Sequence, residues 1–300
     1  RGHRRQMSEF AADLDLIRDA AEAAGRLALS ERDAGLKIWS KSGGSPVTSA
    51  DMAVDQLLRE TLLTARPDHG WLSEETADDK ARTASGLIWL VDPIDGTRDF
   101  VAGRSGWAVS VALVSAGRPL IGMLAAPARR EEWVAVAGQG ATLNGVTIRA
   151  SQRTEFSGAR VPTVSLPKDD SDLVMVHQPN SIALRIAMVA ADQADLVATL
   201  RWGYEWDIAA ATLIAREAGA ETEVQALGKA EMGNGVLEVD GVGPLERRGI
   251  PVRGVEIEHD SLPGGHHDIA DRLVHPTPAR GEARGRAEAD QFLDTPFQHV

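Results

Sequence analysis

Apolar residues recur every three or four positions along two N-terminal stretches, a spacing typical of amphipathic helices. The first stretch runs from Ser8, a candidate N-cap, to about Ser30, and the second follows Asp51 and ends before Pro67. The residues between them, KSGGSPVT at 41–48, are rich in turn-forming types. The sequence therefore predicts two helices joined by a loop.

Short apolar runs bordered by polar or glycine-rich turns come next, and each run predicts a strand. These runs are residues 87–91, 109–114, 121–125 and 133–137. The glycine-rich segment 138–145 after them predicts a tight turn. It resembles a phosphate-binding loop only superficially, because it lacks the lysine that such loops carry.

The alternation of elements restarts beyond Val161. The predicted elements are a strand at 173–176, a helix at Ser181–Leu200 and a helix at Ile208–Ala218. Gly219 follows the last of these and can end it. The restart predicts a mixed α/β protein with two lobes, residues 8–150 and 151–229, rather than one uniform sheet.

Residues 230–300 differ in kind from the rest of the chain. Gly and Pro together make up about 11% of residues 1–227 and about 23% of residues 228–300, and apolar periodicity fades. A disordered tail is the plain interpretation of this shift. The alternative hypothesis is that a frame shift produced 230–300, and that residues 1–6 precede a natural start at Met7.

The composition and net charge of the chain argue against several classes of binding partner and site. The chain has 300 residues, 43% of them hydrophobic, and a net charge of −12, which argues against a nucleic-acid polymer or an anionic membrane as the main partner. It has no cysteine, which excludes disulfides and thiolate metal sites. No apolar run approaches the ~20 residues of a membrane span. The basic residues 1–6 lead into no apolar stretch, so we do not expect them to be a secretory signal. We therefore expect a cytoplasmic protein.

Acidic residues stand where surface charge alone does not explain them. Asp92 and Asp95 follow an apolar strand around a proline turn, and Glu74 follows an apolar pair. Asp51 and Asp207 lie where helices begin, so helix capping is an alternative role for both. Carboxylates aimed at one point suit a hard cation such as Mg²⁺, and a pair of such ions activates water for phosphoryl transfer.

One motif is specific, and it carries a family resemblance. Asp-Pro-x-Asp-Gly-Thr fixes five residues, which a chain of this length matches by chance roughly once in ten thousand. Four segments together resemble the inositol monophosphatase superfamily, which comprises Mg²⁺-dependent, lithium-sensitive phosphatases. The segments are SPVTSAD (45–51), LSEE (72–75), VDPIDGT (91–97) and WDIAA (206–210). Glu205 before Trp206 and the SPVT loop look more like the 3′(2′),5′-bisphosphate nucleotidase branch.

The resemblance implies a fold of alternating α-β-α-β-α layers and a set of roles. Two or three Mg²⁺ ions would be held by Glu74, Asp92, the Ile94 carbonyl, Asp95 and Asp207. The resemblance also implies that Asp51, Thr97 and Glu74 activate the attacking water. Gly96, Thr97, Ser181 and Asp207 would contact the substrate and its phosphate. A homodimer is a further expectation, since relatives are often homodimers.

Several assignments keep an alternative. Glu75 is interpreted as either a solvated residue or a neighbour that supports the ligands, rather than as a ligand itself. Lys41 is either a surface residue or a group that reaches the metal-bound water or the phosphate. Arg98, Arg104, Arg185 and Arg201 are candidate cations for the substrate, with plain surface exposure as the alternative.

The function that follows is a phosphomonoesterase acting on a small phosphorylated substrate. The resemblance to the nucleotidase branch implies removal of the 3′-phosphate of 3′-phosphoadenosine 5′-phosphate. Inositol-1-monophosphatase activity is the alternative within the same chemistry. A non-catalytic relative with a damaged C-terminus is the alternative from another class.

Overall fold

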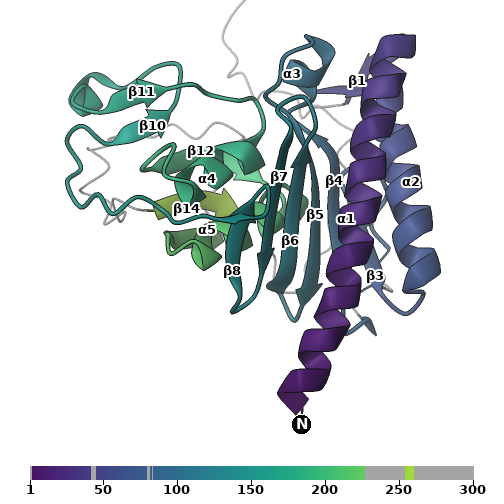
Figure 1. Cartoon of the computed structure of the whole chain (residues 1–300). Helices are drawn as coiled ribbons and strands as arrows, with labels where there is room; N and C mark the ends of the chain where they lie inside the picture. The colour runs from purple at the N-terminus through teal and green to yellow at the C-terminus, as the bar shows by residue number, and fades with distance from the viewer. Residues whose placement is uncertain (1, 42–44, 80–81, 83, 227–253, 260–300) are drawn as a thin grey trace, which may run out of the picture. The chain divides into compact units, whose positions relative to one another are not determined.

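The computed structural model describes residues 2–41, 45–79, 82, 84–226 and 254–259, all within one compact unit spanning 1–264. Helices α1 (Gly2–Ala34) and α2 (Ser49–Ala65) pack on one face of a seven-stranded sheet, and α4 (Ile182–Ala190) and α5 (Glu205–Glu217) pack on the other (Figure 1). A three-stranded sheet lies against α4 and α5. The predicted α/β class is confirmed, with four alternating layers among the described residues.

The seven-stranded sheet has its strands in sequence order. The strands are β3 (Gly70–Ser73), β4 (Ile88–Asp95), β5 (Ala108–Ser115), β6 (Arg118–Ala126), β7 (Glu131–Val136), β8 (Gly140–Leu143) and β9 (Val146–Thr147). β3 and β4 run parallel, and each later strand pairs antiparallel with the one before it. Antiparallel neighbours need only short turns, which explains the closely spaced apolar runs of the sequence.

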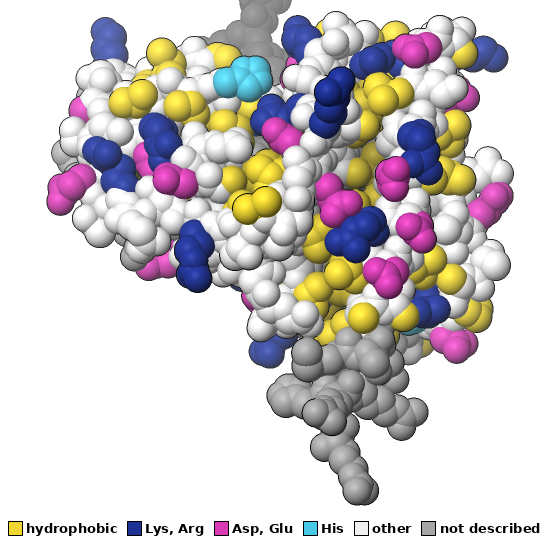
Figure 2. Space-filling view, in the orientation of Figure 1, with side chains coloured by type: hydrophobic (Ala, Val, Ile, Leu, Met, Phe, Trp, Pro, Cys, Tyr) yellow, Lys and Arg dark blue, Asp and Glu magenta, His cyan; other side chains and the backbone are white. Residues whose placement is uncertain are grey.

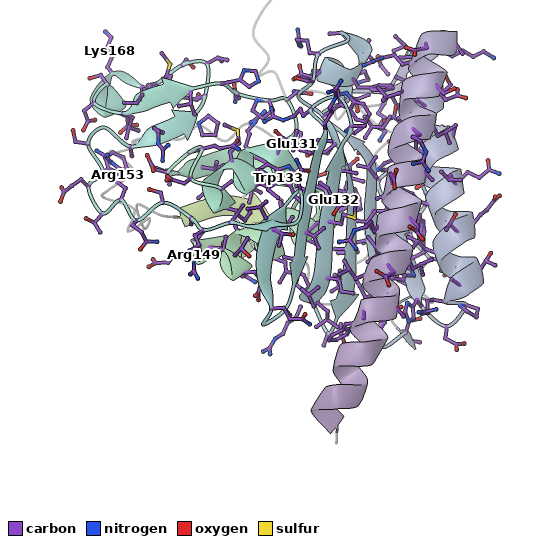
Figure 3. The ribbon with its side chains drawn as sticks, viewed as in Figure 1. Glu131, Glu132, Trp133, Arg149, Arg153 and Lys168 are labelled. Carbon is purple, nitrogen blue, oxygen red and sulfur yellow. The ribbon has the colours of Figure 1, made fainter. Side chains whose placement is uncertain are left out.

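Strand side chains alternate between the two helical layers because successive residues face opposite sides of a sheet. Trp89 and Val91 join the core beneath α1 and α2, whereas Leu90 joins the core beneath α4 and α5. On β7, Glu132 accepts a hydrogen bond from Arg18 of α1, and Trp133 packs into the α4–α5 core (Figure 3). Both faces of the sheet are therefore buried.

The smaller sheet is fully parallel, in the order β12 (Val197–Gly203), β14 (Gly254–His259), β13 (Glu221–Ala226). β14 belongs to the segment 230–300, where the sequence pattern indicated no strand. The rest of that segment, 230–253 and 260–300, lies outside the described residues, so the prediction of an atypical tail stays a prediction.

Short elements complete the described chain. β1 (Ile38–Ser40) and β2 (Pro46–Thr48) form an antiparallel hairpin, and β10 (Arg160–Pro162) pairs in parallel with β11 (Val174–Val176). The short helix α3 (Thr97–Val101) directly follows β4. Within the described residues no helix combines the length and apolarity needed to cross a bilayer. On the face seen in Figure 2, basic and acidic side chains are interspersed, unlike the basic stripe of a nucleic-acid-binding surface.

Two predicted boundaries are wrong. The first helix begins at Gly2, so Ser8 lies inside it and is not its N-cap. The helix predicted over Ser181–Leu200 ends at Ala190, because Asp192 adopts a left-handed conformation (φ 56°) and the chain then enters β12. Asp195 accepts hydrogen bonds from Arg160, a residue 35 positions earlier. A tertiary contact of this kind overrides local helix preference.

Candidate active site

Two of the predicted acidic residues meet at the carboxyl ends of the parallel strands β3 and β4. The Glu74 N–H, just beyond β3, donates to the Val91 carbonyl at 3.2 Å. That contact places Glu74 beside Asp92, the next residue of β4. Carboxyl ends of parallel strands meet at one edge of a sheet, which is where α/β proteins bind ligands.

A bulge in β4 brings Asp95 to the same edge as Asp92. Asp92 pairs with Ser110 of β5, and Asp95 pairs with Ala108, so three steps on β4 oppose two on β5. On a regular strand, residues three apart face opposite sides, and a one-residue bulge re-phases them. Both carboxylates consequently line one cavity.

Asp51 and Asp207 occupy equivalent positions on two different helices. The capping interpretation placed them at the N-cap, but they stand at the third helical residue, with Thr48 and Tyr204 as the N-caps. In each case one carboxylate oxygen accepts the N-cap backbone N–H at 2.8 Å. This capping uses one carboxylate oxygen of each residue and leaves the other available for a ligand.

The site is a cavity of about 260 Å³. Its lining comes from the segments that the motifs marked and from the start of α4: Ser45, Pro46, Glu74, Asp92, Ile94, Asp95, Gly96, Thr97, Arg98, Asn180, Ile182 and Asp207. One carboxylate oxygen from each of Glu74, Asp92 and Asp207 lies within 4.8 Å of the others. Three of the predicted ligands therefore converge.

Asp95 also lines the cavity, and it is held by Ser181 and the start of α4. Asp95 accepts hydrogen bonds from the Ser181 hydroxyl and from the Ala183 N–H at 2.8 Å and the Ile182 N–H at 3.3 Å. Ser181 is fully buried, and its own N–H donates to the Gly106 carbonyl at 2.9 Å. In this structure Ser181 and the first amides of α4 orient Asp95.

Asp51 and Thr97 lie together at the side of the cavity next to α2. The Thr97 hydroxyl is 3.1 Å from the Ile94 carbonyl oxygen and 3.5 Å from Asp51 Oδ1. Asp51 is buried, and its Oδ2 is held by the backbone N–H and the hydroxyl of Thr48. Asp51 Oδ1 is thus directed to Thr97, as expected for a pair that handles one proton.

Gly96 has a position that no other residue type can fill. Its φ of +93° lies in the left-handed region, and a Cβ there would stand 2.6 Å from the Gly106 carbonyl oxygen and 2.8 Å from the Ser181 nitrogen. The missing side chain lets β4 turn directly into α3. This turn places Gly96 and Thr97 in the lining of the cavity.

Lys41 forms ion pairs with both Glu74 and Glu75. The Lys41 ammonium donates to Glu74 Oε1 at 2.8 Å and to Glu75 Oε1 at 2.7 Å. Burial lowers the pKa of Lys41, but the charges and hydrogen bonds of the two glutamates outweigh it and raise that pKa above its ordinary value. Lys41 is therefore engaged with the two glutamates rather than free on the surface, and its predicted contact with the phosphate stays a prediction.

The acids of the site resist ionisation. Burial, reinforced by the charge of Glu74, raises the pKa of Asp92 far above its ordinary value, and burial with the charge of Asp95 does the same for Asp207. Burial also raises the pKa of Asp51 and of Asp95 to about 6 each, and that of Glu75 to about 7. A buried oxygen-rich cluster with one nearby ammonium fits a divalent hard cation, which would relieve this repulsion.

The sequence reasoning missed Asp55, which lies one helical turn after Asp51 on α2. It is 5% exposed, and its two carboxylate oxygens accept the hydroxyls of Ser73 and Thr76. These two residues flank Glu74 and Glu75. An acid four positions after Asp51, on the same helix face, was the available signal.

Comparison with known proteins identifies the family. Residues 11–240 match the model of the inositol monophosphatase family. The chain belongs to the inositol monophosphatase family. All four motif segments fall inside the matched region.

Relatives in this family carry several names. A histidinol-phosphatase of Mycobacterium tuberculosis is 32% identical over 219 residues, covering 68% of this chain and 82% of that protein. Inositol monophosphatase 2 of Solanum lycopersicum is 31% identical over 231 residues, covering 71% and 86%. The solved IMPase of Thermotoga maritima is similar with a TM-score of 0.64 and 29% identity, covering 70% and 84%.

Membership settles the coarse class of activity. The family consists of phosphatases that act on small phosphorylated substrates and are generally Mg²⁺-dependent, and the carboxylate cluster suits that metal. The relatives above do not single out the bisphosphate nucleotidase branch.

Proposed function

We propose that this protein is a Mg²⁺-dependent phosphomonoesterase that hydrolyses its substrate by in-line attack of water. The observation that carries the proposal is the convergence of Glu74, Asp92 and Asp207 beside the Asp51–Thr97 pair. Carboxylates that bind metal and a carboxylate positioned to take a proton are what hydrolysis of a phosphate ester requires.

The chain's own residues supply the metal ligands. Glu74, Asp92 and the Ile94 carbonyl would hold one ion, and Asp92, Asp95 and Asp207 a second. When bound, Mg²⁺ supplies Lewis-acid stabilisation of the phosphoryl oxygens and lowers the pKa of the attacking water. The raised pKa values of the buried acids support this assignment, because a cation is the partner they lack.

Asp51 takes the proton from water in this proposal. Its Oδ2 is held by Thr48, so Oδ1, on the side of Thr97, is the oxygen that accepts the proton. A pKa of about 6 leaves this carboxylate ionised and weakly basic at neutral pH. The water oxygen bonds to phosphorus, the bond from phosphorus to the leaving oxygen breaks, and that oxygen takes up a proton from solvent. The backbone N–H groups of Gly96 and Thr97 bind the phosphate.

The proposed substrate is 3′-phosphoadenosine 5′-phosphate. The Glu205-Trp206-Asp207 sequence supports it through its resemblance to the nucleotidase branch. Tyr204 adds a structural argument, because its half-exposed ring stacks on Trp206 with centroids 4.6 Å apart. An exposed aromatic ring fixed next to Asp207 offers a surface on which a purine can stack.

Inositol 1-phosphate is the second candidate substrate. The similarity to the protein named inositol monophosphatase 2 favours it. The leaving group decides between the two candidates, since the phosphate and the acids are common to both reactions.

An assay of phosphate release tests both the proposed Mg²⁺-dependent hydrolysis and the proposed substrate. Equal concentrations of 3′-phosphoadenosine 5′-phosphate, inositol 1-phosphate and histidinol phosphate are assayed with Mg²⁺ and with EDTA. We expect Mg²⁺-dependent release that is fastest from the nucleotide. Faster release from inositol 1-phosphate or histidinol phosphate would retain the chemistry and reject the nucleotide. Asp68→Asn, at an exposed acid, is the control for Asp51→Asn. The mechanism would be rejected if no substrate released phosphate, or if the two variants released phosphate at equal rates.

A further inference from the structure

Arg98 stands out among the residues that line the cavity. It is the one cationic side chain in that lining as far as the structure describes it, whereas four of the other residues are acidic. Arg98 is exposed and lies on the first turn of α3. It directly follows Thr97, so the two Cα atoms are about 3.8 Å apart. A flexible guanidinium thus stands beside the proposed phosphate-binding backbone.

The neighbouring cations have partners among the described residues, whereas the Arg98 side chain has none there. Lys41 pairs with Glu74, Arg104 pairs with Asp99, and Arg185 donates to the Pro179 carbonyl. No ion pair or hydrogen bond joins the Arg98 side chain to any described residue, although four carboxylates share its cavity. An arginine that served only to neutralise those acids would pair with one of them, as Lys41 does.

The chemistry of the side chain indicates its ligand. A guanidinium binds phosphate oxygens through two parallel hydrogen bonds and keeps its charge at any physiological pH. The phosphate that is transferred already has the carboxylate-bound metal and the Gly96–Thr97 backbone as partners in the proposed function. Arg98 is then left for an anion on another part of the substrate.

We propose, on the basis of the proposed phosphatase function, that Arg98 binds a second phosphate carried by the leaving group. The cavity would thereby select phosphomonoesters that are bisphosphorylated. Two classes of substrate carry a second phosphate within reach of one arginine side chain: nucleoside 3′,5′-bisphosphates and sugar bisphosphates. A substrate that presents an ammonium group there, such as histidinol phosphate, would be disfavoured by charge.

The test compares matched substrates that differ by one phosphate. The nucleotide arm uses 3′-phosphoadenosine 5′-phosphate against adenosine 3′-phosphate, and the sugar arm uses fructose 1,6-bisphosphate against fructose 1-phosphate. Both arms are measured with Mg²⁺ on the full chain, on Arg98→Gln and on Arg118→Gln. Arg118 is an exposed arginine at the start of β6, outside the cavity lining, and serves as the control.

We expect Arg98→Gln to raise KM for the bisphosphate of the preferred arm at least tenfold more than KM for its monophosphate. Arg118→Gln should change both by less than twofold. The arm with the larger selective loss identifies the leaving group as nucleoside or sugar. Equal losses on both members of each pair would place Arg98 on the transferred phosphate and overturn the proposal, as would no loss in Arg98→Gln.

A binding measurement separates failure of this proposal from failure of the proposed function. Adenosine 5′-phosphate, which keeps only the second phosphate, is titrated calorimetrically against adenosine. Weaker binding of the phosphate form in Arg98→Gln, with adenosine unchanged, supports the anion site even if no substrate is turned over. If the phosphate form binds no better than adenosine to the unsubstituted chain, the anion site is absent.

Discussion

Replacing Asp51 by Asn should stabilise the metal-free protein while it abolishes turnover. Burial raises the pKa of Asp51 from 3.8 to about 6, so the ionised carboxylate costs folding free energy at neutral pH. A gap of about two pKa units corresponds to about 3 kcal/mol. Asparagine keeps an oxygen for the Thr48 N–H, but it removes a negative charge from the start of α2, which forfeits about 0.3–1 kcal/mol.

The net expectation is a gain of about 2 kcal/mol, or about 4–8 °C in Tm for a domain of this size. Thermal unfolding is followed by circular dichroism in EDTA at pH 7.5 and at pH 4.5. The folded-state pKa is raised, so the charge penalty is absent below about pH 4, grows between about pH 4 and 6, and is complete above pH 6. The advantage of the variant should therefore shrink at pH 4.5.

The control variant Asp68→Asn removes an exposed carboxylate and should shift Tm by no more than about 1–2 °C at either pH. Saturating Mg²⁺ should stabilise the unsubstituted chain more than Asp51→Asn. A variant that is less stable than the unsubstituted chain in EDTA at pH 7.5 would refute the reasoning, because it would mean that the buried charge carries no cost.

Further predictions concern the metal, the turn, the Glu74 segment and a distant ion pair. Mg²⁺ at a hundred times its Kd should add about 2.7 kcal/mol at pH 7.5, measured by thermal shift, and much less at pH 5, where the carboxylates protonate. Gly96→Ala should abolish activity and lower Tm, since its Cβ meets the Gly106 carbonyl. Asp55→Ala should raise the Mg²⁺ concentration for half-maximal activity about tenfold, because Asp55 holds the Ser73 and Thr76 hydroxyls on either side of Glu74 and Glu75. Asp55→Asn should raise that concentration less, and equal effects of the two variants would exclude a positioning role for Asp55. Asp195→Asn should lower the free energy of unfolding by about 2 kcal/mol at pH 7, measured by urea unfolding. Burial raises the pKa of Asp195, but its hydrogen bonds with Arg160 outweigh burial and lower that pKa from 3.8 to about 2. The stabilisation by the ionised Asp195 is therefore present above pH 4 and lost as the pH falls through 2.

Local sequence was enough to identify the elements that hold the site. The apolar periods predicted α2, the strands β4–β7 and α5, because these elements bury one face or both and their side-chain spacing records it. The sequence predicted the N-cap positions less accurately than the elements themselves. Asp51 and Asp207 were interpreted as N-caps, but each stands three positions further into its helix, because Thr48 and Tyr204 are the N-caps.

The helix predicted over 181–200 shows where local preference misleads. Its apolar residues fit a helical period, yet only those up to Ala190 form the helix. Beyond it, the Asp195 carboxylate binds Arg160, and the next residues pair with β14, which follows 51 positions after β12 ends. No window of local sequence contains those partners, so no local pattern could have predicted the strand.

The sequence by itself determined which residues have the chemistry for this site: acids after strands, a proline turn between Asp92 and Asp95, and a glycine at 96. Only the tertiary structure decided that they act together. Glu74, Asp92 and Asp207 are 18 and 115 positions apart, and they meet because β3 pairs in parallel with β4 while α5 packs across the sheet. Burial in that packed edge also raises the pKa values of the acids, a property that belongs to their surroundings and not to the residues themselves.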